Sequence, residues 1–379
     1  MNKTSLRCYI DRLIARPVIG LAIALTATTP TATAGDDHQE GRDAIHYVYT
    51  LDNAQVDNRV VVLKQRPDGA LVQAGSVSTG GAGTGAGLGS QGALALSKNG
   101  RWLFAVSAAS NQITTFSVHD GKLRPASVVS SGGLTPISVT SHGKLVYVLN
   151  AGGTGSITGF ELGNHGDLAP IPGSTQGLGG SATGPAQIAF AKDGDFLVVS
   201  QKAANQLAVY ALDDGVAQPA TLSKSSGNVP FGFDIDRRGH VIVSEAAAST
   251  VSSYELGDVG DLSVITASAQ TFQGAACWLI LTPNGRYAYT GNAATSTITG
   301  FGVTRQGKLK LLVPSGESAS TGAGSHTLDL ATSANGNFLY ALANVGQSVT
   351  AFRIGADGSL VQTGQFTGVP TSAAGLVAR

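Results

Sequence analysis

The stretch NGNFLYALANVGQSVTAFRIGADGSL, residues 335–360, decides the fold. It opens with an Asn-Gly turn, continues through apolar runs at residues 338–342 and 349–354, and closes with an Asp-Gly turn before Leu360. Asn-Gly and Asp-Gly supply the positive-φ residues that two-residue hairpins need, and the apolar runs have the length of strands. The stretch therefore predicts three antiparallel strands joined by hairpins.

The same unit recurs along the whole chain. The second turn occurs seven times, usually with a leucine two residues later, and has its glycines at Gly69, Gly121, Gly166, Gly215, Gly260, Gly307 and Gly358. The first turn occurs six times at spacings of 43 to 51 residues, with glycines at Gly100, Gly143, Gly194, Gly239, Gly285 and Gly336. A period near 45 with four short strands per unit is typical of a β-propeller. The sequence predicts an all-β, seven-bladed β-propeller of four-stranded antiparallel blades.

One copy of the unit lacks its opening strand. The first blade begins at residues 46–50 with its second strand, while residues 374–379, AGLVAR, have no blade of their own. We expect this C-terminal strand to join blade one and close the ring, which removes the free sheet edges that promote aggregation. Residues 45–379 should form one propeller domain, because a closed ring of repeats has no internal place to divide.

The N-terminus has the pattern of a secretory signal. Residues 1–34 carry four basic residues, then an apolar run at 18–25 and alanines in A-x-A spacing at Ala32 and Ala34. We expect cleavage after Ala34 and a periplasmic or extracellular protein, with residues 35–44 as a flexible lead-in. A retained membrane anchor is the less favoured alternative, because the apolar run is too short to span a bilayer.

Charge and cysteine content narrow the function classes. Removal of residues 1–34 leaves 20 basic and 23 acidic residues, a net charge of −3, so nothing indicates binding to nucleic acid or to an anionic membrane. Cys277 then stands alone in an apolar strand, where a buried, inert thiol is the usual case. A closed ring without an evident apolar patch is expected to be a monomer.

A glycine-rich run, TGGAGTGAGLGS, occupies residues 79–90. It resembles a phosphate-binding loop, but no helix pattern follows it, and the helix N-terminus is what gives such a loop its affinity for anions. We interpret it as a flexible loop between blades. Similar loops at residues 173–184 and 315–325 could shape the rim of a pocket if they share a face.

Propeller ligands generally bind at the mouth of the central channel. Two rings of candidate residues can be derived from the repeat. The ring at the ends of the second strands comprises Ser107, Asn150, Gln201, Glu245, Asn292 and Asn344. The ring around the inner strands comprises Gln187, Gly232, Trp278 and Asp329, with Gln91, Pro136 and His326 close to the strand starts.

Three of these residues are candidates for catalysis. Glu245 is the only carboxylate among neutral polar residues and could be a general base, although it could equally accept hydrogen bonds from loop amides. Asp329 could pair with it for acid/base chemistry or could cap a turn. His326 has a suitable native pKa for proton transfer, although a loop histidine is more often solvated or a packing residue.

The substrate-binding candidates are Asn150, Gln187, Gln201, Trp278 and Asn292, of which Trp278 could equally be a packing residue. No HExxH, CxxC pair or G-x-S-x-G motif is present, and the seven histidines are scattered at blade-scale distances. A calcium site is chemically conceivable, but the two rings hold only Glu245 and Asp329 as acids. We therefore expect no metal and no cofactor.

The repeats resemble those of the bacterial propeller lactonase family, relatives of 6-phosphogluconolactonase and of the fungal carboxymuconate cyclase. The resemblance covers residues 45–379 and rests on copies such as SKNGRWLFAVSAASNQITTFSV, LVYVLNAGGTGSITGFEL, PFGFDIDRRGHVIVSEAAASTVSSYEL and AACWLILTPNGRYAYTGNAATSTITGF. It implies a seven-bladed propeller that hydrolyses or forms a lactone ring without a metal or organic cofactor. The resemblance implies a His, a Glu and Arg residues for a cyclase-type site. Of these, only the Glu has a counterpart in this sequence, Glu245.

Two functions of different class follow. In the first, a lactone of a small sugar acid or a muconate-like compound enters the channel, Glu245 activates water, and the amides of Asn150, Gln201 and Asn292 stabilise the oxyanion. In the second, the propeller is a non-catalytic extracytoplasmic scaffold whose loop-rich face binds a protein or a glycan. The absent Arg and His favour the scaffold, whereas the isolated Glu245 favours the enzyme.

Overall fold

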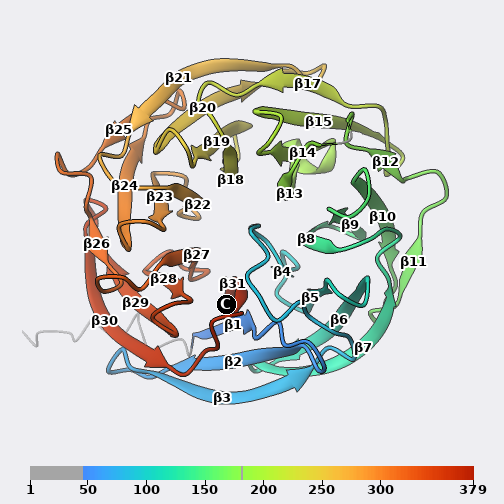
Figure 1. Cartoon of the computed structure of the whole chain (residues 1–379), viewed down its shortest axis with the longest axis horizontal. Coiled ribbons are helices and arrows are strands. Elements are labelled where there is room, and N and C mark those ends of the chain that lie inside the picture. Colours follow the sequence, from blue (N-terminus) through green and yellow to red (C-terminus); the bar gives the residue numbers. More distant parts are fainter. Residues whose placement is uncertain (1–45, 181) are drawn as a thin grey trace, which may run out of the picture. The chain divides into compact units, whose positions relative to one another are not determined.

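The computed structural model describes residues 46–180 and 182–379. The predicted signal peptide at residues 1–34 and the predicted lead-in at 35–44 lie outside the described residues. Figure 1 shows seven sheets set radially around a central channel, and the hydrogen-bonded strand orders give each sheet four successive strands from the inside outward. The predicted all-β, seven-bladed propeller is confirmed.

Each blade contributes one strand to each of four concentric layers. The innermost strands are β31 (Ala374–Ala378), β4 (Leu94–Leu96), β8 (Pro136–His142), β13 (Pro185–Ala191), β18 (Pro230–Ile235), β22 (Ala276–Leu281) and β27 (Thr327–Thr332). The second strands are β1 (Tyr47–Leu51), β5 (Trp102–Ser107), β9 (Leu145–Asn150), β14 (Phe196–Gln201), β19 (His240–Glu245), β23 (Tyr287–Asn292) and β28 (Phe338–Ala343).

The two outer layers are less regular. The third strands are β2 (Arg59–Gln65), β6 (Gln112–His119), β10 (Ser156–Leu162), β15 (Gln206–Asp213), β20 (Thr250–Leu256), β24 (Thr297–Val303) and β29 (Ser348–Ile354). The outer strands are β3 (Leu71–Ser78), β7 (Lys122–Ser130), β11 (Leu168–Pro170), β16 (Val216–Ala217), β21 (Leu262–Gln270), β25 (Leu309–Leu311) and β30 (Leu360–Thr367). In three blades a short extra strand also pairs with the third strand: β12 (Gln176–Gly177), β17 (Thr221–Lys224) and β26 (Ala319–Ser320).

The C-terminal strand closes the ring as predicted. β31 pairs with β1 in antiparallel register, with Tyr49 opposite Val377 and Thr50 opposite Leu376. The Thr50 hydroxyl also donates a hydrogen bond of 2.7 Å to the carbonyl of Gly375. Blade one therefore takes its innermost strand from the opposite end of the chain.

The core lies between the blades. Apolar side chains of the second and third strands pack against the neighbouring sheets, and buried tyrosines link one blade to the next. Tyr147 donates a 2.7 Å hydrogen bond to the carbonyl of Gly215, and Tyr289 donates one of 2.8 Å to Gly358. Both acceptors belong to the second of the two recurring turns, so these turns also dock each blade on its predecessor.

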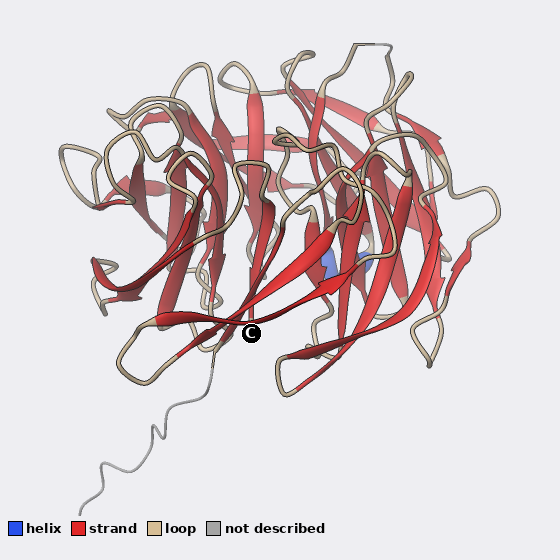
Figure 2. Ribbon diagram, turned by 60° about the horizontal axis from the view of Figure 1, so that its bottom comes forward, coloured by secondary structure: helices blue, strands red, loops and turns tan. Residues whose placement is uncertain are grey.

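The strands run between two faces that carry the loops and turns (Figure 2). One face, the turn face, carries the turns between inner and second strands, including the only helix among the described residues, the 3-10 helix η1 (Lys192–Gly194). The opposite face, the strap face, carries the loops that lead into the inner strands. Within the described part of the chain, no helix has the length and apolarity needed to cross a membrane.

Candidate functional site

The glycine-rich run crosses the channel mouth on the strap face. Residues 79–91, which we call the strap, leave β3 at the edge of blade one and extend to the middle of the ring before β4 begins (Figure 1). We predicted a flexible loop between blades. The strap does join two blades, and it makes hydrogen bonds along most of its length.

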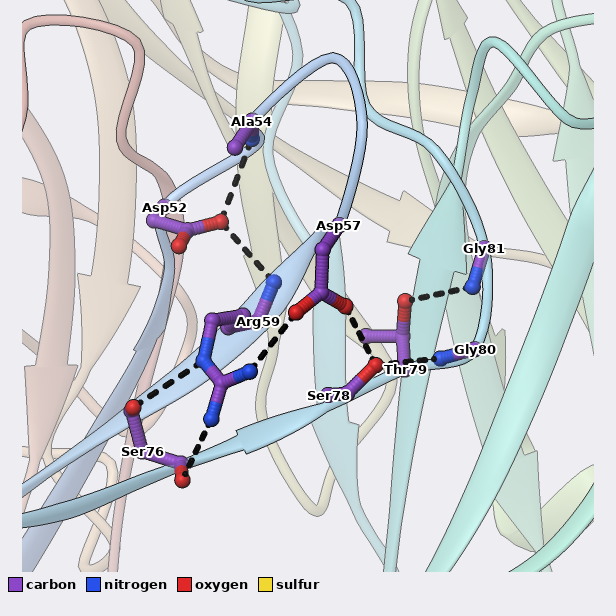
Figure 3. Close-up of polar contacts among 9 residues, drawn as sticks. All are labelled: Asp52, Ala54, Asp57, Arg59, Ser76, Ser78, Thr79, Gly80 and Gly81. Atoms are coloured by element: carbon purple, nitrogen blue, oxygen red, sulfur yellow. Dashed lines mark hydrogen bonds and ion pairs between the residues drawn. The ribbon is translucent and has the colours of Figure 1, made fainter.

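The base of the strap is fixed by a polar cluster on blade one (Figure 3). Asp57 forms an ion pair of 2.6 Å with Arg59 and accepts a short hydrogen bond from the Ser78 hydroxyl. The same Ser78 hydroxyl accepts the backbone N–H of Gly80 at 3.0 Å. The hydrogen bonds that Ser78 and Arg59 donate to the Asp57 carboxylate hold its pKa below the ordinary value, with the Ser78 bond as the larger cause.

The middle of the strap packs on Asn53, which is buried and lies in the left-handed region with φ of 50°. The Asn53 amide nitrogen donates to Thr84 Oγ1 at 2.9 Å and to the Ala86 carbonyl at 2.6 Å. A Cβ atom on Gly83 would lie 2.3 Å from the backbone of Asn53. Glycine at this position lets the strap lie directly against the loop before β2.

The end of the strap fills the channel mouth. The Gln91 amide donates a 2.6 Å hydrogen bond to the Leu279 carbonyl and accepts one of 3.0 Å from the Leu279 N–H. Its backbone N–H donates to the Ala186 carbonyl at 3.1 Å. A Cβ atom on Gly232 would lie 2.1 Å from Gln91 Oε1, so that glycine leaves the room that the Gln91 side chain occupies. Gln91 thus contacts three inner strands, β13, β18 and β22.

Two cavities flank the strap and share its residues Gly87 and Leu88. The strap cavity, of about 250 Å³, has walls that include Trp278, Asp329 and Asn344. The second cavity, of about 400 Å³, lies over blades three and four, and Lys202 is the only charged residue in the described part of its lining. The structure therefore brings together three residues of the two predicted rings, Trp278, Asp329 and Asn344.

Asp329 is the ionisable group of the strap cavity. Burial raises the pKa of its carboxyl to about 7, and the backbone N–H groups of Leu330, Gly92 and Leu376 partly oppose that shift. Oδ1 accepts the Leu330 N–H at 3.0 Å, whereas Oδ2 accepts no well-formed hydrogen bond from any described residue. A carboxyl with a pKa near 7 can both take up and release a proton near neutral pH.

Trp278 and Lys202 hold the strap from two sides. The Trp278 indole N–H donates to the Ser90 carbonyl at 2.9 Å, and its ring lies 4.9 Å from that of Phe231. The Lys202 ammonium donates to the Gly89 carbonyl and lies 4.9 Å from the centroid of the Phe231 ring. Burial lowers the pKa of Lys202, and the nearby Cys277 opposes that change.

Lys202 was not among the predicted site residues. It follows the predicted Gln201 directly in a chain in which charged residues are sparse, and that isolation is the signal that could have identified it. Cys277 agrees with its predicted role as an inert thiol, because burial raises its pKa to about 12 and a protonated thiol is a poor nucleophile.

Glu245 lies between blades four and five, where none of its surface is exposed. Its carboxylate accepts hydrogen bonds from the hydroxyls of Ser225, Thr250, Ser252 and Ser268 and from the Gly227 N–H at 2.6 Å. A Cβ atom on Gly227 would lie 2.3 Å from Glu245 Oε2. This placement supports the structural alternative, and the general-base role stays a prediction.

The predicted amides of the same ring are also fully buried between blades. Asn150 donates to the Ser131 carbonyl at 3.3 Å, and Gln201 donates to the Leu178 carbonyl at 2.8 Å. Asn292 donates to Thr297 and Thr299 at 3.1 and 2.9 Å. None of the three lines either cavity beside the strap, so their placement gives no support to a role in substrate binding.

The inner ring divides into structural and cavity residues. Gln187 bonds both backbone groups of Phe233, at 2.9 and 2.8 Å, and so links the inner strands of blades four and five. His326 is exposed on the strap face with φ of 60°, and its backbone N–H donates to Ser296 Oγ at 3.0 Å. His326 does not line the strap cavity, whose described walls contain Asp329 as their only ionisable side chain.

Asn344 is offset by one residue from the predicted ring. Ala343 pairs with Ser348 in the same way that Glu245 pairs with Thr250 and Asn292 with Thr297. Asn344 therefore follows the end of β28, and it lines the strap cavity instead of a space between blades. Its amide donates to the Thr371 carbonyl at 3.1 Å, and its own carbonyl oxygen has no partner among the described residues.

The model of the family described as lactonase, 7-bladed beta-propeller, matches residues 26–178 and 156–277. The chain belongs to this lactonase family. A curated relative from Arthroderma benhamiae, named "Probable 6-phosphogluconolactonase", is 23% identical over 251 residues. That match covers 57% of this lactonase-family chain and 63% of the relative, so less than two thirds of the relative's length is represented.

Solved structures share the fold of this lactonase-family chain at low identity. The periplasmic gluconolactonase of Pseudomonas aeruginosa superposes with a TM-score of 0.70 and 16% identity over 88% of this chain and 99% of its own. A protein from Lactobacillus plantarum superposes with a TM-score of 0.73 and 15% identity over 88% and 99%. At such identities the likeness concerns the fold alone, and the chemistry has to be argued from the side chains.

The described residues of this lactonase-family chain contain no cluster of metal-ligand side chains. Among residues 46–180 and 182–379, no three His, Cys, Asp or Glu side chains gather as a metal ion would require. The strap cavity instead combines one carboxyl, one amide, one indole ring and the glycines of the strap. Such a set can position a small polar molecule and exchange a proton with it.

Proposed function

We propose that this protein hydrolyses lactones of small sugar acids or muconate-like compounds in the strap cavity. The observation that carries the proposal is Asp329, a buried carboxyl with a pKa of about 7 that lines a cavity of about 250 Å³ and whose Oδ2 accepts no well-formed hydrogen bond from a described residue. Membership of the lactonase family supports the reaction class. Trp278 supplies an apolar wall for the carbon skeleton, and the free Asn344 carbonyl can accept a substrate hydroxyl.

Asp329 can serve both halves of the reaction. As a carboxylate it takes a proton from water while the water oxygen bonds to the lactone carbonyl carbon. The tetrahedral intermediate then breaks its bond to the ring oxygen, and the protonated Asp329 returns the proton to that oxygen. The products are the open hydroxy acid and the regenerated carboxylate. This role replaces the predicted one of Glu245, whose oxygens are occupied by five donors.

The test is hydrolysis of a panel of aldonolactones, muconolactones and acyl-homoserine lactones. The variant Asp329→Asn should lose at least ~100-fold in kcat, the range for removal of a general base, and wild-type kcat/KM should rise with pH through about 7. Asp234→Asn is the matched control, because Asp234 is another channel carboxyl whose pKa burial raises, to about 6, on the opposite face. Full activity of Asp329→Asn, or no hydrolysis across the panel, would contradict the proposal.

The scaffold remains the second candidate, because the strap closes the channel mouth and leaves large apolar side chains exposed on the loops of that face. Val56, Phe272 and Val345 are 93%, 66% and 54% exposed. The test is capture of a partner from an envelope extract. A partner that binds the wild type but not the double variant Phe272→Ser/Val345→Ser would favour the scaffold. Failure to recover any partner would count against it.

We further propose that the protein is exported and acts as a monomer. Residues 1–34 would be removed after Ala34, in keeping with the signal pattern of the sequence. Mass spectrometry of the protein recovered from the periplasm or medium should give a chain that begins at Gly35, and light scattering should give the mass of one chain. An N-terminus at Met1 or a dimer mass would contradict these two expectations.

A further inference from the structure

The channel mouth on the turn face holds two larger cavities, of about 550 and about 460 Å³. Both have the segment Ile235–Arg238 in their walls, so they meet at the turn that follows β18. Their volumes fall within the range of ~300–1,000 Å³ that is usual for small-molecule sites. We call the two together the turn-face mouth.

The charges of this mouth are balanced. Its walls carry four cations, Lys98, Lys192, Arg237 and Arg238, and four acids, Asp193, Asp195, Asp234 and Asp236. Two of the cations have partners, because Lys192 lies 2.6 Å from Asp258 and Arg238 lies 3.8 Å from Asp236. No ion pair among the described residues involves Lys98 or Arg237, and none involves Asp193 or Asp195. Groups of both signs are therefore left for a ligand.

One wall of the mouth offers an apolar surface. Ile280, Leu281 and Pro283 line the larger cavity together with Ile235. Asp234 is partly exposed beside them and accepts hydrogen bonds from Leu281 N–H at 2.9 Å and Ile235 N–H at 2.8 Å. A carboxylate has about four acceptor sites, so Asp234 retains capacity for a donor on a ligand.

The turn that carries Asp193 has an unusual backbone. Lys192, Asp193 and Gly194 have φ angles of 47°, 52° and 102°. In the five other turns of this kind, only the glycine has a positive φ, at Gly100, Gly143, Gly239, Gly285 and Gly336. Left-handed conformations are strained for residues other than glycine, and the other five turns show that hairpin formation does not require two further positive φ angles.

We propose that the turn-face mouth binds a zwitterionic α-amino acid with an apolar side chain. Arg237 and Lys98 pair with the α-carboxylate, Asp193 and Asp195 pair with the α-ammonium, and the side chain lies against Ile280 and Pro283. Balanced charges favour a ligand that carries both signs, since a purely anionic ligand would be repelled by the acids. This inference does not depend on the proposed lactone hydrolysis, which takes place on the opposite face.

Calorimetric titration of the purified protein tests the ligand class. Leucine should bind, while N-acetyl-leucine, which lacks the ammonium, and leucinamide, which lacks the carboxylate, should each bind at least tenfold more weakly. Gluconate, a hydroxylated carboxylate without an ammonium, should not compete with leucine. No binding of leucine up to about 10 mM, which corresponds to less than ~3 kcal/mol, would overturn the proposal, as would equal binding of either analogue or displacement by gluconate.

Two variants and one control locate the site. Arg237→Ala and Asp193→Gly should each weaken leucine binding at least tenfold, and Lys202→Ala at the strap face should leave it unchanged. Asp193→Gly should also raise the Tm, because glycine adopts a φ of 52° without strain. A raised Tm with unchanged binding would assign the turn a purely structural role and overturn the proposal. Loss of binding in Lys202→Ala alone would place the ligand on the wrong face.

Discussion

The side-chain amide of Gln91 hydrogen-bonds both backbone groups of Leu279, a residue 188 positions away in the chain. The pair joins the end of the strap to the inner strand of blade six, across the mouth of the channel. These two hydrogen bonds from one buried side chain fix the end of the strap to β22. We call this contact the tether; through it, the strap packs as part of the inner wall of the propeller.

Replacement of Gln91 by alanine should therefore destabilise the protein. The change leaves the Leu279 N–H and carbonyl without partners in a buried place, and each such group costs roughly 1–3 kcal/mol. We expect a loss of about 3 kcal/mol in urea denaturation. Gln55→Ala is the control, because the exposed Gln55 makes a single hydrogen bond to the strap, and a loss as large in that variant would contradict the tether.

Two glycines of the strap, Gly83 and Gly87, differ in the space that an added Cβ atom would find. Gly83→Ala should lower the stability by about 1–3 kcal/mol, because its Cβ would lie 2.3 Å from the Asn53 backbone. Gly87→Ala should be neutral or stabilising by about 0.5 kcal/mol, since a Cβ there meets nothing within 4 Å and alanine restricts the unfolded chain. Thermal denaturation of both variants checks the difference, and equal Tm values would show that the strap does not pack as described.

Glu245→Gln should affect stability more than turnover. The substitution replaces one carboxylate oxygen by an amide nitrogen, which then faces either Ser225 and Gly227 or Thr250, so at least one buried donor loses its acceptor at a cost of about 1–3 kcal/mol. Glu255→Gln, an exposed change on the adjacent strand β20, should stay within about 0.5 kcal/mol. If folded Glu245→Gln protein lost turnover on a lactone that wild type hydrolyses, Glu245 would regain its predicted catalytic role.

The Asp329 carboxyl should make stability depend on pH. Its ordinary pKa is 3.8, and burial raises it to about 7 in the folded protein. Below pH 3.8 both states hold the proton; between 3.8 and 7 only the folded state does, so its stabilising contribution falls as pH rises through 7. Relative to wild type, Asp329→Asn should gain unfolding free energy from about pH 4 to about pH 7 and then stay level, measured by urea denaturation. Parallel pH profiles would contradict the raised pKa.

The blades could be predicted because turns and strands alternate within a short stretch. The stretch at residues 335–360 appears as β28, β29 and β30, with the turns at Gly336 and Gly358 where the sequence places them. Ring closure was also predictable. The first blade lacks an inner strand, and the C-terminal strand has no blade of its own, so each one supplies what the other lacks. Both inferences depend on local backbone preferences and on counting, which a single sequence supplies.

The direction of the polar side chains could not be predicted in the same way. Both surfaces of each blade are covered by neighbouring blades, so alternation along a strand does not distinguish the channel from the space between blades. Asn150 and Glu245 looked like channel residues and instead face the preceding blade. The fixed position of the strap could not be predicted either. It depends on hydrogen bonds of Asn53, Gln91 and Trp278 that join residues up to 188 positions apart.

The pairing of β1 with β31 also constrains how the protein is made. The first blade takes three of its four strands from residues 47–78, but its innermost strand, residues 374–378, is synthesised after the strands of the other six blades. A ribosome-bound chain can therefore stack blades two to seven in order while β1 keeps an unpaired edge. Closure has to wait until residues 374–378 have left the ribosome, so blade one keeps an open edge until the strands of all seven blades have been synthesised.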